Sequence, residues 1–216
     1  MSYKGSTFCT LIVFFVGLVR DKEKITLSLQ NKTYNSMPMI EVKIKDSELQ
    51  KAAGESDDAF VGIFVEAIKK AIGGGLDAEG MSRLNADQIT LLAWDILHEE
   101  VMDGGLIQLI HNGYGGFIYM NPTDKAFRNW GLTNLYRWIN RSHGLYVSHH
   151  EEIERDCTDE EFMALYEKFP QFDDYDDAFV ENEEQWTSEI AHYIDAHLER
   201  GQGEIKAKGT FALIVE

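Results

Sequence analysis

Two groups of side chains in this sequence could bind a metal ion, and the first is a pair of histidines. His149 and His150 are adjacent and precede two glutamates, so they offer nitrogen and oxygen ligands for a metal-assisted hydrolase. The chain has no His-Glu-x-x-His motif, however, and His192 and His197 stand five residues apart, on different faces of a helix. A hydrolase that uses His149, His150 and nearby carboxylates is therefore an alternative function.

The second group is the aspartate run at residues 173–177, which resembles the start of a calcium loop. Asp174 and Asp176 fit the first positions of an EF-hand, but Ala178 and Phe179 follow where an oxygen ligand and a glycine are needed. The sequence also has no Gly-x-Ser-x-Gly nucleophile motif and no P-loop lysine. We therefore predict no catalytic residue, no metal site and no cofactor.

The carboxylates of the chain are concentrated in one segment. Residues 151–186 contain fifteen of the thirty-seven Asp and Glu residues and two basic residues, so they carry −13 of the total charge of −17. Such a surface repels nucleic acid and membranes, and it attracts basic partners through a field that salt screens. The segment favours protein binding over catalysis, although plain solubility is an alternative reason for its charge.

We predict that these carboxylates imitate the phosphates of DNA. Duplex DNA presents one phosphate per roughly 3.4 Å along each strand, and its binding proteins carry basic surfaces shaped for that spacing. An acidic immunity or structural binder with a partner that does not bind nucleic acid would share the same surface. The expected partner-binding residues are Glu160, Glu161, Asp173, Asp174, Asp176, Asp177, Glu181, Glu183 and Glu184.

The two ends of the chain show the period-two alternation of half-buried strands. Ile40, Val42 and Ile44 alternate with charged residues, residues 25–30 alternate in the same way, and a similar pattern at residues 205–211 leads into apolar residues 212–215. We predict a small antiparallel sheet between the N- and C-terminal segments. The apolar run at residues 9–19 is about half the length of a membrane span, and we interpret it as a buried strand.

The middle of the chain is predicted to be helical, because apolar side chains recur every three or four residues. Capping boxes at Asn85–Gln88 and Thr158–Glu161 mark two helix starts. Residues 173–177 are interpreted as an acidic loop. The expected helices lie over residues 60–72, from 85 to a break or kink at Gly104-Gly105, after Pro122, over 158–169, and over 179–198.

The fold class we predict is mostly α (α+β), a helical core with a small β element. The expected units are residues 1–80 with strands and one helix, the helical acidic domain at 81–200, and a C-terminal strand at 201–216 that packs on the N-terminal part. Residues 1–36 are a candidate start-site extension. Cys9 and Cys157 lack metal-ligand spacing, and reduced thiols in a cytoplasmic protein account for them.

From about residue 85 to 200 the chain resembles the DNA mimic protein 19 family. The run Glu100–Leu109, followed by Asn112, is similar to the family signature Glu-Val-x-Asn-Gly-Gly-Phe-x-Gln-Phe…Asn, with Asp103 and Leu106 replacing the usual Asn and Phe. We interpret the signature as structural: the glycines permit a tight turn between helices, and the polar side chains satisfy backbone groups there. These residues are Glu100, Asp103, Gly104, Gly105, Gln108 and Asn112.

The resemblance implies a mostly α acidic domain that binds a DNA-binding transcription regulator in place of DNA. It also implies a possible homodimer. On this interpretation the partner is a basic DNA-binding protein, and the chain binds neither nucleic acid nor membranes directly.

Overall fold

The computed structural model describes residues 39–74, 78–198 and 211–216, and these residues are mostly helical. The mostly α class is therefore confirmed. The predicted strands before residue 39 and the alternating residues 205–210 lie outside the described residues. The elements are β1 (Lys43–Lys45), α2 (Asp46–Glu55), α3 (Asp57–Ala71), α4 (Ala78–Ser82), α5 (Ala86–His111), α6 (Gly115–Tyr119), α7 (Thr123–Asn129), α8 (Thr133–Ile153), α9 (Asp159–Lys168), the 3-10 helix η2 (Pro170–Phe172), α10 (Asp173–Ala196) and β2 (Leu213–Val215).

The two strands pair, but they run parallel, so the predicted antiparallel arrangement is wrong. Ile44 lies opposite Ile214 in the register of the pair. Parallel strands need a long crossover between them, and here the helices α2 to α10 form that crossover. The alternation itself is confirmed, because Val42 and Ile44 are buried while Lys43 and Lys45 are exposed.

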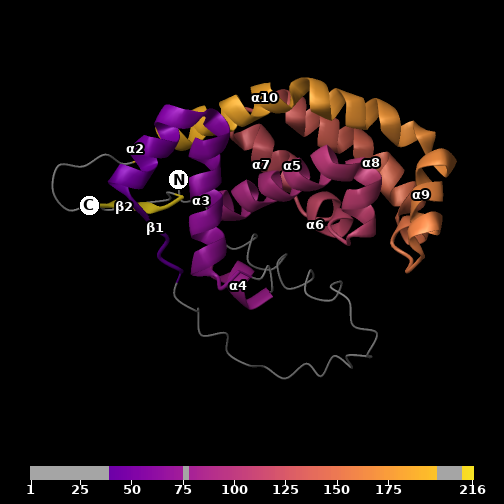
Figure 1. Ribbon diagram of the computed structural model, residues 1–216, viewed down its shortest axis with the longest axis horizontal. Coiled ribbons are helices and arrows are strands. Elements are labelled where there is room, and N and C mark those ends of the chain that lie inside the picture. The colour runs from indigo at the N-terminus through magenta and orange to yellow at the C-terminus, as the bar shows by residue number, and fades with distance from the viewer. Residues whose placement is uncertain (1–38, 75–77, 199–210) are drawn as a thin grey trace, which may run out of the picture.

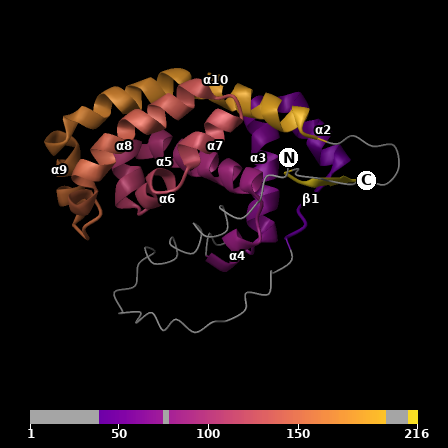
Figure 2. The same cartoon turned by 180° about the vertical axis from the view of Figure 1, so that it is seen from behind.

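The helices form an arch, and α10 runs along its outer side (Figure 1). Seen from behind, α9 lies at one end of the arch and α2 with the strands at the other (Figure 2). One cluster of buried side chains extends from β1 and α3 through α5 to α10, and it includes Phe64, Phe179 and Trp186. The inner face of α10 therefore belongs to the core, while its outer face meets solvent.

The helices differ from the prediction at three places. A helix that the sequence pattern did not indicate, α2, precedes α3. Two helices, α7 and α8, follow Pro122, and Gly131 turns the chain between them at a φ of 95°. Residues 173–177 form the first turns of α10, not a loop, because carboxylates at a helix N-terminus are stabilised by the helix dipole.

Both predicted capping boxes are present. The side chain of Asn85 accepts a hydrogen bond from the N–H of Gln88, and the side chain of Gln88 accepts one from the N–H of Asn85. Thr158 and Glu161 make the same reciprocal pair at the start of α9. Within the described ranges, no helix is both long enough and apolar enough to cross a membrane.

Candidate functional site

The outer face of α10 carries a row of exposed carboxylates, Asp173, Asp177, Glu181 and Glu184, which we call the α10 stripe. At 3.6 residues per turn, these four positions fall within a sector of about 80° around the helix axis. Asp174 is exposed beside them, and Glu160 and Glu161 are exposed at the start of α9. Seven of the nine predicted partner-binding residues therefore face solvent.

The basic side chains of the acidic segment do not neutralise the α10 stripe. Lys168 and Arg155 both pair with Glu152, Arg155 at a distance of 3.6 Å between Nη2 and Oε1. Among the residues that the structure describes, no ion pair involves a carboxylate of the stripe. The stripe therefore keeps its full charge for a partner from outside the chain.

Asp176 differs from the other predicted binding residues because its side chain points into the fold. Its Oδ1 accepts a hydrogen bond of 2.9 Å from the backbone N–H of Leu106 in α5. That N–H has no helical partner, because Gly104 and Gly105 leave helical geometry immediately before it, Gly105 at a φ of 72°. Asp176 therefore caps the second half of α5, and its role is structural.

Polar side chains of the signature also hold this kink together. The amide nitrogens of Gln108 and Asn112 both donate to Oε2 of Glu100, at 3.3 and 2.7 Å, and Gln108 donates to Asp103 at 2.8 Å. The prediction of a structural signature holds in outline, but these side chains bond to one another rather than to the backbone. The backbone oxygen of Gly104 instead accepts from the hydroxyl of Tyr166 in α9. The kink thus joins α5 to α9 and α10.

Burial raises the pKa of Asp176 to about 6, and the charges of Asp173 and Asp177 act in the same direction, while the Leu106 N–H acts against them. The folded pKa lies above the unfolded value of about 3.9, so the folded state binds the proton more tightly. Stability from this group is therefore present below about pH 4, and it is lost as pH rises through about 6.

We expect Asp176→Asn to remove this loss, because the amide oxygen keeps the Leu106 cap without a buried charge. At pH 7 the variant should be more stable than the wild type by up to about 3 kcal/mol. Urea denaturation between pH 4 and 7 measures the effect, and Asp174→Asn, at an exposed neighbour, is the matched control that keeps the wild-type slope. Parallel pH profiles for the wild type and Asp176→Asn would contradict this assignment.

Glu183 is the second predicted binding residue that the structure turns inward. Its Oε1 lies 2.8 Å from Nε2 of His98 on α5, and it also accepts from the hydroxyl of Thr187 at 3.3 Å. The side chain is only 13% exposed. Glu183 is thus engaged within the fold rather than available on the outer face of α10.

The two histidines of the hydrolase alternative do not form a metal site in the described residues. Nε2 of His149 lies 3.0 Å from the amide nitrogen of Gln171, and its ring packs on Phe169. His150 faces Glu154 of its own helix, 3.6 Å away, with its ring stacked on Tyr146. In the part of the chain that is described, the group with metal-ligand geometry lies elsewhere, at Asp58, His98 and Glu183.

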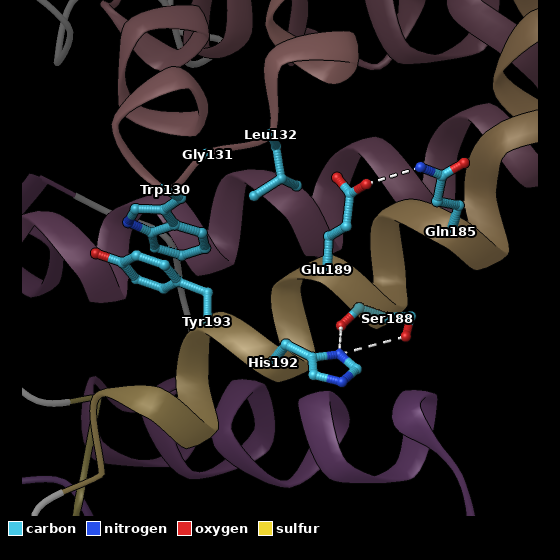
Figure 3. A pocket seen from close by; sticks show the side chains of 8 residues that line it. All are labelled: Trp130, Gly131, Leu132, Gln185, Ser188, Glu189, His192 and Tyr193. Atoms are coloured by element: carbon cyan, nitrogen blue, oxygen red, sulfur yellow. Dashed lines mark hydrogen bonds between the residues drawn. The ribbon is translucent and has the colours of Figure 1, made fainter.

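An open pocket of about 450 Å³ lies between the turn after α7 and the side of α10 (Figure 3). Trp130 and Tyr193 stack at one end, with ring centroids 4.6 Å apart. The polar groups that line the pocket are bonded within α10, Gln185 to Glu189 and His192 to the backbone of Ser188. This pocket therefore shows no nucleophile with an oriented base, and the α10 stripe is the stronger functional candidate.

Comparison with known proteins identifies relatives of the segment that contains the kink and the stripe. The model of the family described as DMP19-like protein matches residues 82–197. The DNA mimic protein DMP19 of Neisseria meningitidis serogroup B (strain ATCC BAA-335 / MC58) is 33% identical over 122 residues, which cover 56% of this chain and 74% of that protein. The family match leaves β1, α2, α3 and β2 outside.

Proposed function

The chain belongs to the DMP19-like protein family, and from this premise we propose that it acts as a DNA mimic. The α10 stripe, with Asp174, Glu160 and Glu161, occupies the basic nucleic-acid-binding surface of a partner protein such as a transcription regulator. The observation that carries the proposal is that the stripe is exposed, unpaired and fixed on a long helix. A rigid array of charges can match a particular basic surface, which a flexible acidic tail cannot do.

The spacing of the stripe supports imitation of one DNA strand. An α-helix advances 1.5 Å per residue, so the eleven steps from Asp173 to Glu184 span about 16 Å. A DNA strand presents about five phosphates over that length. The four carboxylates of the stripe come close to this number, so basic side chains placed for DNA find anionic partners at a similar density.

The proposal includes the setting in which such binding takes place. The partner is a basic DNA-binding protein in the cytoplasm, and the effect of binding is regulation of transcription. The acting form is a homodimer, which doubles the acidic surface presented to a dimeric regulator; light scattering at micromolar concentration tests this part separately. A binder of this kind needs no cofactor and no catalytic residue.

Salt should weaken the complex steeply, because its attraction is between exposed charges. By analogy with DNA, four neutralised contacts would reduce affinity about 10–100-fold between 50 and 200 mM salt. The chain is immobilised, native lysate is applied at low salt, and the retained proteins are eluted with a salt gradient and then with duplex DNA. Retained proteins that resist salt, or that duplex DNA does not displace, would instead favour a binder with a partner of another class.

A further inference from the structure

We propose that Asp58, His98 and Glu183 form a binding site for a divalent transition-metal ion of the zinc class. This site is independent of the DNA-mimic surface, because its side chains lie between helices and not on the α10 stripe. One ligand atom from each residue, a carboxylate oxygen or His98 Nε2, lies within 4.8 Å of the other two. Each residue comes from a different helix, α3, α5 and α10, which pack on one another.

The donor atoms suit zinc better than calcium or magnesium. An imidazole nitrogen and two carboxylate oxygens are ligands of zinc, whereas the hard ions prefer oxygen alone. Ligand atoms 2.0–2.2 Å from a tetrahedral zinc ion stand roughly 3.3 Å from one another. The 2.8 Å between His98 Nε2 and Glu183 Oε1 has to widen slightly, and Asp58 has to move inward. Asp58 is exposed, so its side chain is free to make this move.

The surroundings of the three residues are also those of a cation site. In the described part of the chain, no Lys or Arg pairs with Asp58 or Glu183, so the two negative charges face the imidazole without a competing cation. The hydroxyl of Thr187 donates to Glu183 Oε1 and helps to orient that carboxylate. When the ion binds, His98 Nε2 gives up its hydrogen bond to Glu183, and the ring takes the Nδ1–H tautomer.

A bound ion would connect two parts of the chain with different histories. His98 and Glu183 lie inside the segment that matches the family, residues 82–197, but Asp58 lies in α3, outside it. The ion would thus fasten α3 across α5 and α10, in addition to the apolar contacts that already hold it there. We infer that metal binding makes docking of the N-terminal helices tighter than packing alone.

Calorimetric titration of the metal-free full chain with zinc chloride tests the site. One ion per chain is expected, and Asp58→Asn should weaken binding at least tenfold, because it removes an exposed ligand without disturbing the fold. Glu183→Gln should weaken it further. His192→Gln is the matched control, since His192 is an exposed histidine on the same helix that bonds only within α10. Cobalt substitution should give the visible absorption of a tetrahedral site in the wild type and not in Asp58→Asn.

The outcome that overturns the proposal is equally specific. Equal zinc affinity for the wild type and Asp58→Asn would show that the ion binds elsewhere on the acidic surface. The absence of any stoichiometric binding by the wild type would show that the His98–Glu183 contact is an ordinary hydrogen bond. Neither result would affect the DNA-mimic proposal, which is tested at residues of the α10 stripe.

Discussion

Replacing the four carboxylates of the α10 stripe by amides is expected to weaken binding of a DNA-binding partner by at least about 100-fold. Close charge pairs across an interface contribute about 1.5 kcal/mol or more each, and a 100-fold loss requires only about 2.7 kcal/mol in total. The fold should remain intact, because these side chains are exposed and form no ion pairs in the described structure. The variant is Asp173→Asn, Asp177→Asn, Glu181→Gln and Glu184→Gln.

The matched control changes the net charge by the same amount at the other end of the arch. It carries four exposed carboxylates of α2 and α3 as amides: Glu48→Gln, Glu55→Gln, Asp57→Asn and Glu66→Gln. Affinity is measured by calorimetry with a partner purified from the capture experiment, and folding by circular dichroism. Equal losses in the two variants would mean that net charge alone attracts the partner, and the assignment of the stripe would then fail.

The kink in α5 gives the second large effect, because Gly105→Ala is expected to destabilise the protein by about 3 kcal/mol. An alanine at the φ of 72° costs about 1–2 kcal/mol on steric grounds. Its Cβ would also stand 2.3 Å from Oδ2 of Asp176, so the cap on Leu106 has to break. Loss of a hydrogen bond to a charged group adds about 1.5 kcal/mol or more.

Gly144→Ala in α8 is the control for Gly105→Ala. A Cβ at Gly144 meets nothing within 4 Å, so this substitution should leave stability unchanged or raise it by up to about 1 kcal/mol. Chemical denaturation of both variants measures the difference. If Gly105→Ala is as stable as the wild type, Asp176 does not hold the kink in the way described.

Local sequence patterns predicted the elements whose causes are local. The two capping boxes, the alternation around Val42 and the break at Gly104 and Gly105 depend on residues close together in the chain, and all are present. The direction of β2 relative to β1 depends on how the intervening helices return the chain, which no short pattern encodes. The charge pattern located the acidic segment, but the structure had to separate its binding residues from its structural ones.

The spacing within α10 contained a signal that distinguishes these two kinds of carboxylate. Positions 172, 176, 179, 183, 186 and 190 recur every three or four residues, so Asp176 and Glu183 fall on the same face as Phe179 and Trp186. Treating residues 173–177 as a loop concealed this periodicity. The partner of Glu183 had no such signal, because His98 lies 85 residues away and the pair forms only when α5 packs against α10. Charge reversal across all of Asp173–Asp177 would therefore disturb the kink as well as the surface.

Competition between this chain and DNA for one partner surface tests the central claim most directly. A purified partner from the capture experiment is bound to a fluorescently labelled duplex, and the chain is titrated in while anisotropy is recorded. The DNA-mimic account predicts that the wild type and the α2–α3 control release the duplex completely, whereas the α10 stripe variant does not. A stable ternary complex of partner, duplex and this chain would contradict the account, because two ligands of one basic surface cannot bind together.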